Sequence, residues 1–269
     1  MKKFLSLLGA LALLVSCSTT DNDNDSDNGN KITLPKKVQN TNPDHPEENS
    51  TSVITYNGKK IVSVTENEEE RTDYIYEGNL VVKTITYDIT YNRNDKKSEK
   101  SYTYTDGKLS SSISVNNFTS EYPFGEHQTR SVYSYNADGT IKKETYSTNA
   151  TTGEEQKNDL YEILTYQNGN LIKVVEKSIS SDRVRTSDYE YDGKDSPYKY
   201  ILGLNLLLDE EFDTNNLIKH TYSVSGTDSE ETGPFIYSIE YEYNESGYPV
   251  KQTYHNQDGT VGAINEYFY

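Results

Sequence analysis

The side chains that could carry out catalysis or bind a metal are scattered along the chain. His residues occur at positions 45, 127, 220 and 255, and none has a second His or a Cys at the spacing of metal ligands. This distribution supports neither a zinc site nor a Ser-His-Asp arrangement, and we interpret each His as a surface residue. We expect no metal and no cofactor.

Carboxylates are abundant and form short runs in predicted loops, namely residues 68–70, 154–155, 209–211 and 230–231. A glycosidase needs two carboxyl groups a defined distance apart, which a sequence does not specify. Each Gly has a turn to explain it, so no phosphate-binding loop is indicated. We favour a non-catalytic binding or structural module. A secreted glycan- or peptide-hydrolysing enzyme with carboxylates on the concave side of a sheet is the alternative.

An acidic tract, Asp21–Asn30, alternates Asp with Asn or Ser and raises the question of calcium binding. An EF-hand loop that started at Asp23 would need Gly at its sixth position and Glu at its twelfth. Asn28 and Leu34 stand at these positions, so no formed metal site follows. With the prolines that follow, the composition predicts a disordered acidic tether over residues 17–50.

The single Cys ends a short apolar N-terminal segment. Two lysines precede the apolar run Phe4–Val15, which is too short to span a bilayer as a mature helix and is typical of a signal peptide. The tetrapeptide Leu14-Val15-Ser16-Cys17 resembles the lipobox of bacterial lipoproteins. This resemblance implies a signal peptide over residues 1–16, cleavage after it, and a membrane anchor of acyl chains on Cys17.

The charge of the chain limits its partners and its location. Lys and Arg number 26 against 43 Asp and Glu, a net charge of −17, so nucleic acid is not an expected partner. A lone Cys also excludes a disulfide scaffold within the chain. The acidic residues after Cys17 resemble the surface-export signal of Bacteroidetes lipoproteins. The implied location is the outer membrane, at the cell surface rather than on the periplasmic face.

The chain has 25 Tyr residues, and many of them recur in a short repeated motif. This repeat predicts the strands and turns that must position any site. Aromatic or apolar residues at i and i+2 precede a polar residue and Gly, and a strand-like run follows. The clearest copies are Tyr74-x-Tyr76-Glu77-Gly78, Tyr102-x-Tyr104-Thr105-Asp106-Gly107, Tyr133-x-Tyr135-Asn136-Ala137-Asp138-Gly139, Leu164-x-Tyr166-Gln167-Asn168-Gly169, Tyr189-x-Tyr191-Asp192-Gly193 and Tyr241-x-Tyr243-Asn244-Glu245-Ser246-Gly247.

This repeat predicts one β-hairpin per copy, because Asn-Gly and Asp-Gly supply the positive φ of tight hairpin turns. We expect turns at Gly58, Gly78, Gly107, Gly139, Gly169, Gly193 and Gly247, with Asn216 replacing Gly in a degenerate copy. Bulges after the turns would explain the less regular returning strands. The predicted fold is all-β: residues 51–269 form an antiparallel up-and-down meander of about sixteen strands, curled or closed into a barrel-like sheet.

One apolar insertion, residues 196–212, interrupts the repeat. It is the most apolar segment after the signal peptide and has no strand pattern. Two interpretations stay open: a plug that fills the concave side of the sheet, which we favour, or an interaction patch. As candidate ligand-binding residues we select Tyr198, Tyr200 and Phe212. The regular i, i+2 placement of the other Tyr indicates core positions.

The phrases Tyr135-Asn136-Ala137-Asp138-Gly139 and Tyr104-Thr105-Asp106-Gly107 resemble the YD repeats of Rhs-type proteins. The combination of a lipobox, an acidic tether and Tyr-rich hairpins resembles that of Bacteroidetes lipoproteins with a porin-like fold. This family implies a curled, barrel-like antiparallel sheet and supplies no activity. The C-terminal Tyr267-Phe268-Tyr269 also resembles the end of integral outer-membrane barrels, but Lys and Glu on the strand faces argue against a lipid-facing band.

Overall fold

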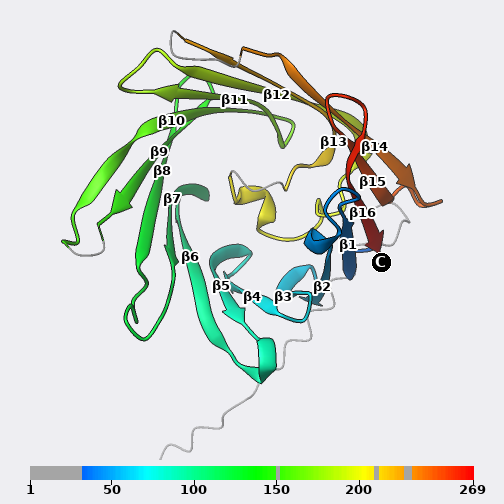
Figure 1. Cartoon of the computed structure of the whole chain (residues 1–269), viewed down its shortest axis with the longest axis horizontal. Coiled ribbons are helices and arrows are strands. Elements are labelled where there is room, and N and C mark those ends of the chain that lie inside the picture. Colours follow the sequence, from blue (N-terminus) through cyan, green and yellow to red (C-terminus); the bar gives the residue numbers. More distant parts are fainter. Residues whose placement is uncertain (1–31, 150–151, 209–211, 227–231) are drawn as a thin grey trace, which may run out of the picture. The chain divides into compact units, whose positions relative to one another are not determined.

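The computed structural model describes residues 32–149, 152–208, 212–226 and 232–269, which form one closed antiparallel barrel (Figure 1). Each strand pairs with its neighbours in the sequence, and β1 pairs with β16 to close the ring. The predicted all-β meander is therefore confirmed. The predicted signal peptide, Cys17, the acidic tract, and residues 209–211 and 230–231 lie outside the described residues.

Sixteen strands make up the wall. They are β1 (Lys37–Thr41), β2 (Ser50–Asn57), β3 (Lys60–Glu66), β4 (Glu70–Glu77), β5 (Leu80–Asp88), β6 (Asp95–Thr105), β7 (Lys108–Asn116), β8 (His127–Tyr135), β9 (Ile141–Thr148), β10 (Glu155–Gln167), β11 (Asn170–Ser178), β12 (Val184–Asp195), β13 (Asn215–Ser225), β14 (Phe235–Tyr243), β15 (Pro249–His255) and β16 (Val261–Phe268). Within the described ranges the helical elements are three 3-10 turns, η1 (Pro46–Glu48), η2 (Thr90–Asn92) and η3 (Leu204–Leu206). None of the helices in these ranges has the length and apolar character of a membrane span.

The strands follow the alternation that the sequence predicts. In β14, Ile239 is buried and Tyr241 lines the lumen, whereas Glu240 and Glu242 are exposed on the outer face. This is the period of two that a pleated strand imposes on its side chains. In β14, Tyr and aliphatic residues therefore form the inner face of the wall.

Six of the predicted hairpin turns are confirmed, at Gly58, Gly78, Gly107, Gly139, Gly169 and Gly247, and each of these glycines has a positive φ. The predicted bulges lie in the returning strands. Between β2 and β3, for example, Thr55 pairs with Ser63 and Tyr56 pairs with Ile61, so Val62 is left over. Such an extra residue accounts for the irregular alternation after five of these turns, whereas the β8–β9 hairpin keeps its register.

Two predicted turn positions are wrong. Gly193 lies inside β12 without a positive φ, and Asn216 lies inside β13, where it is buried. Tyr191 pairs with Leu217 across these strands, just as Tyr166 pairs with Leu171 in a normal hairpin. The insertion thus occupies the place of a hairpin turn. A further tight turn, at Gly259 between β15 and β16, was not predicted.

The predicted start of the barrel at residue 51 is also wrong, because β1 lies within the segment predicted as tether. β1 pairs with β16 from Lys37 opposite Phe268 to Thr41 opposite Ile264, and with β2 on its other side. Its five residues include a single aliphatic one, Val38, so composition did not reveal it. Backbone hydrogen bonds to two neighbouring strands hold it, and Val38 packs against the buried cluster.

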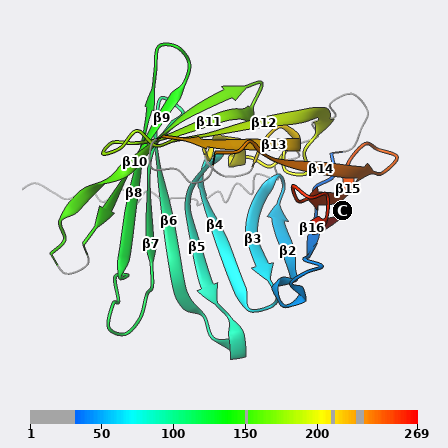
Figure 2. The same cartoon turned by 45° about the horizontal axis from the view of Figure 1, so that its top comes forward.

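The two ends of the barrel differ (Figure 2). We call the end with the six confirmed turns the turn rim, and the opposite end, with longer loops such as residues 117–126, the loop rim. β1 begins and β16 ends at the turn rim, where the Lys36 N–H donates to the Phe268 carbonyl at 2.6 Å. The chain therefore enters and leaves the barrel at the same end.

Candidate ligand site in the barrel lumen

The insertion enters the lumen because it is apolar and the inner face of the wall is apolar near the turn rim. Ile201 and Leu204 are 1% and 0% exposed, and they belong to one buried cluster with Ile54, Val81 and Leu164 of the wall. Figure 1 shows the insertion in yellow inside the ring of strands. The insertion is thus a plug, as the favoured interpretation predicts.

Backbone contacts fix the plug to the turn rim. The Leu202 N–H donates to the Lys59 carbonyl at 3.0 Å. Gly203 has φ +83°, and a Cβ there would lie 2.7 Å from the carbonyl oxygen of Asn79. This position therefore needs glycine both for its backbone conformation and for the close approach of the β4–β5 turn.

Polar side chains hold the base of the insertion. Asp195 accepts hydrogen bonds from Lys199 Nζ and from the Tyr200 hydroxyl, each at 2.6 Å. Burial opposes ionisation of Asp195, but these two bonds outweigh it, so its pKa lies below the usual range. Tyr200, one of the three predicted ligand residues, thus braces the insertion and is absent from the lining of the lumen cavities described below.

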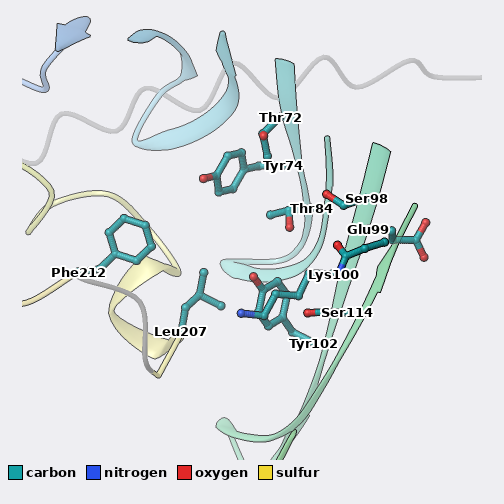
Figure 3. Close-up of a pocket in the computed structure, with 11 residues that line it drawn as sticks. Thr72, Tyr74, Thr84, Ser98, Glu99, Lys100, Tyr102, Ser114, Leu207 and Phe212 are labelled. Carbon is teal, nitrogen blue, oxygen red and sulfur yellow. The ribbon is translucent and has the colours of Figure 1, made fainter. Parts of the chain in front are cut away.

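The other two predicted residues, Tyr198 and Phe212, stand beside open space in the lumen. Three cavities, of about 290, 610 and 300 Å³, adjoin the insertion; Phe212 lines all three and Tyr198 lines two. The two rings meet edge to face, with centroids 5.9 Å apart and an interplanar angle of 82°. In Figure 3, Phe212 and Leu207 face the wall across the first cavity.

The 610 Å³ cavity lies between the insertion and strands β12–β16. Its lining combines aromatic rings with carboxamides: Leu171, Tyr189, Tyr191, Ser196, Pro197, Tyr198, Phe212, Asp213, Asn215, Asn216, Leu217, Tyr241, Gln252, Tyr254, Asn265 and Tyr267. Sequence analysis missed the wall residues of this set. The available signal was their inward parity, but every inward Tyr carries that signal, so parity alone does not single them out.

A hydrogen-bond network orders the polar part of this lining. The buried Gln252 donates from Nε2 to the Tyr241 hydroxyl at 2.7 Å, and its Oε1 accepts from Asn265 Nδ2 at 2.9 Å and from the Tyr267 hydroxyl at 2.8 Å. Asn40 of β1 donates in turn to Asn265 at 2.8 Å. Burial raises the pKa of Tyr267 well above its ordinary value, so this phenol stays neutral and keeps its proton to donate.

An aromatic stack on the inner wall, not anticipated from the sequence, adjoins this cavity. His220 stacks on Tyr189 with ring centroids 4.7 Å apart and planes 7° apart, and on Tyr237 at 6.1 Å. Its Nε2 is buried and has no hydrogen-bond partner among the described residues. The prediction that His220 is a surface residue is therefore wrong, because its strand turns this position inward.

The carboxylates near the lumen are engaged by the protein itself. Asp213 accepts from the Leu171 N–H at 2.7 Å and from the Tyr191 hydroxyl at 2.9 Å. Glu99 borders the first cavity but pairs with Lys83 and Lys96, and Figure 3 shows its carboxylate directed away from Phe212. The three cavities thus place no two carboxylates of the described residues together, and those residues hold no metal-ligand cluster either.

The outer face of the wall carries ion pairs on and between its strands. They include Arg71–Asp73, Lys83–Glu99, Arg130–Glu155, Lys142–Glu144, Lys173–Asp188, Lys219–Glu190 and Lys251–Glu242, with N···O distances of 2.5–3.1 Å. Their positions alternate with lumen-facing ones such as Tyr74, Tyr189 and Tyr241. Paired charges thus occur on the outside of the barrel on strands from β4 to β15 except β7, beside exposed apolar side chains such as Ile75 and Ile236.

Comparison with known proteins shows likeness at the level of the fold. The chain matches no protein-family model and no curated protein sequence. A porin-like protein from Bacteroides vulgatus superposes with a TM-score of 0.57 at 17% identity, covering 88% of this chain and 99% of that one. A porin-like protein from Bacteroides uniformis gives a TM-score of 0.50 at 13% identity, covering 87% and 96%. The barrel is thus similar in fold to porin-like proteins of Bacteroides.

Proposed function

We propose that this protein is a lipid-anchored cell-envelope protein that binds a ligand inside its barrel without catalysis. The observation that carries the proposal is the lumen itself. The insertion plugs the turn rim and leaves a 610 Å³ cavity beside Tyr198 and Phe212, within the size range of small-molecule sites. The porin-like names of the structural neighbours support an envelope location.

The outer wall supports a lipid anchor in place of a membrane-spanning barrel. Each Lys or Arg on a lipid-facing strand costs about 2–4 kcal/mol at the bilayer midplane. Pairs such as Lys142–Glu144 and Lys173–Asp188 suit a wall that stands in water. The acyl chains on Cys17 would then supply the membrane attachment, at the outer membrane and on the cell surface.

The path of the chain suggests how the anchored barrel is oriented relative to the membrane. Residues 18–31 link Cys17 to the described part of the chain, which enters the barrel at the turn rim. The plugged end would therefore face the membrane. Ser50 and Asn116, at the loop-rim ends of β2 and β7, line two of the lumen cavities, so the cavities extend toward the end that points away.

Cell fractionation of a Cys17→Ala variant tests the anchor. Without acylation the protein loses its only proposed membrane attachment, so we expect it in the soluble fraction, while a Ser18→Ala control stays with the membranes. If Cys17→Ala resists carbonate extraction, the wall or another segment holds the membrane and the proposal is wrong.

Incubation of the purified protein with oligosaccharides and peptides tests the non-catalytic part. We expect no turnover. Hydrolysis that an Asp213→Asn substitution abolishes would establish the hydrolase alternative, because Asp213 is the one carboxylate among the described residues that line the 610 Å³ cavity.

A further inference from the structure

We propose that the ligand of the 610 Å³ cavity is an uncharged carbohydrate, which rests a ring face on Phe212 and Tyr198 and exchanges hydrogen bonds with the carboxamides of the opposite wall. The inference rests on the proposed function and adds the chemical class of the ligand. It follows from what the cavity offers to each class of molecule.

Charged ligands find no matching group in this cavity. The described residues that line it include no Lys, Arg or His, so an anion would lose its hydration without gaining a counter-charge. The one carboxylate, Asp213, already accepts from the Leu171 N–H and the Tyr191 hydroxyl. A cation would therefore meet a single carboxylate that already accepts two hydrogen bonds, with no second carboxylate among the described residues of the lining.

A purely apolar ligand suits the cavity no better. Gln252, Asn265 and the hydroxyl of Tyr241 lie on one wall, and a hydrocarbon that displaced water from them would leave their remaining hydrogen-bonding capacity unused. Each carboxamide has two N–H groups and two acceptor lone pairs. At Asn265, the bonds to Asn40 and Gln252 use one N–H and one lone pair. Donors and acceptors thus lie together, as alternating sugar hydroxyls require.

The plug supplies the complementary apolar surface. Phe212 borders open space in three cavities, and the Tyr198 ring stands at 82° to it, so the two rings form a corner. The C–H groups on one face of a pyranose are apolar and weakly positive, and the face of an aromatic ring is negative. An uncharged sugar therefore matches both sides of the cavity: ring faces on the plug and amides on the wall.

Calorimetric titration of the purified protein with cellobiose, maltose, xylobiose and mannobiose tests the inference. Matched uronic-acid disaccharides and a medium-chain fatty acid serve as charged and apolar probes. We expect at least one neutral disaccharide to bind, and Phe212→Ala to weaken its affinity at least tenfold. Phe124→Ala, which removes an 89% exposed ring in the β7–β8 loop, should leave the affinity unchanged.

Two measurements keep the result interpretable. The melting temperature of each variant shows whether the barrel has folded. Phe212→Tyr, which retains the ring face, should retain binding even if Phe212→Ala is destabilised.

The outcomes separate the two proposals. Phe212-dependent binding of a neutral disaccharide supports the inference. Phe212-dependent binding of the uronic-acid or fatty-acid probe alone overturns the ligand class but supports a binding lumen. Neutral sugar binding with the same affinity in Phe212→Ala as in the parent protein overturns the site. If no probe of any class binds, the inference fails and the proposed binding function loses its support.

Discussion

Several tyrosine hydroxyls join a strand to an earlier stretch of the chain. Five of them donate to backbone carbonyls beside the turn rim: Tyr56 to Pro35, Tyr104 to Val81, Tyr135 to Leu109, Tyr191 to Leu171 and Tyr269 to Pro249, at 2.7–3.0 Å. The ring fills the inner face and the hydroxyl satisfies a carbonyl near a bulge. At these five positions Tyr therefore makes a hydrogen bond that Phe, with a similar apolar area, could not make.

Tyr104→Phe tests this role. Burial raises the pKa of Tyr104 to about 12, so the hydroxyl keeps its proton at neutral pH and donates to the Val81 carbonyl at 2.8 Å. Its loss should lower the free energy of unfolding by about 1 kcal/mol, measured by urea denaturation. Tyr91→Phe, at a 93% exposed ring, is the control and should change nothing. Equal stability of the two variants would refute the role.

His220 predicts a pH dependence of stability. Burial in the aromatic stack lowers its pKa below the ordinary 6.5. The imidazole therefore binds a proton more weakly in the folded protein than in the unfolded chain. Arg185, near the ring of Tyr222, adds a like charge on the same face. As the pH falls from 7.5 to 5.5, the free energy of unfolding should therefore decrease.

The His220→Phe variant isolates this contribution, because Phe keeps a ring in the stack and cannot be protonated. Denaturation at pH 7.5 and 5.5 should show a smaller loss of stability for the variant than for the parent. Carboxylates contribute equally to both proteins and cancel in the comparison. Identical losses would mean that His220 titrates as in the unfolded chain.

At the scale of the elements, similar copies of the repeat motif adopt two different structures. Gly107 ends such a phrase with φ +74° in a tight turn, whereas Gly193 ends a similar one inside β12. The chain after Gly193 leaves the wall as the plug and returns at Asn215. The motif therefore forms a tight turn only when the strand that pairs with it follows directly in the sequence.

Matched glycine substitutions test this difference. Gly107→Val places a β-branched residue at positive φ and should cost about 1–3 kcal/mol of stability, although its Cβ meets open space. Gly193→Val also meets open space, without positive φ, and should be nearly neutral. Thermal denaturation of both variants measures the difference. A larger loss of stability in Gly193→Val than in Gly107→Val would contradict the assignment of positive φ to Gly107 and not to Gly193.

At the scale of the whole molecule, the plug fills the closed barrel at the turn rim, and two of the lumen cavities extend to Ser50 and Asn116 at the loop rim. The described chain enters the barrel at the turn rim, so with the proposed anchor on Cys17 the loop rim would face away from the membrane. Ligand access then requires no passage through the bilayer. Such an orientation would distinguish the protein from a channel, whose axis crosses the membrane.

Site-directed fluorescence tests the orientation. With Cys17 acylated, a fluorophore on Ala137→Cys at the turn rim or on Glu121→Cys at the loop rim is the only label. In vesicles that contain nitroxide lipids, position 137 should be quenched more strongly than position 121, because it lies nearer the anchor. Equal or reversed quenching would contradict the proposed orientation.

Local sequence determined the strands and most of the turns. Alternation in segments such as Phe235–Tyr243 and Gly at positions such as 107 act over a few neighbouring residues, so a sequence reveals them. The apolar character of the insertion likewise indicated a plug. Tyr198 and Phe212 were selected because they belong to that segment, and both line the lumen.

Only the tertiary structure decided closure and the far wall of the site. β1 pairs with β16 across more than two hundred residues, through backbone groups that every sequence possesses, so its composition resembled a tether. Closure brings Asn40 to Asn265, and with it the network of Gln252, to the cavity that the plug borders. Each of these amides is unremarkable in its own strand. They become a site because a closed wall turns them inward toward one space, and that geometry depends on contacts between distant segments.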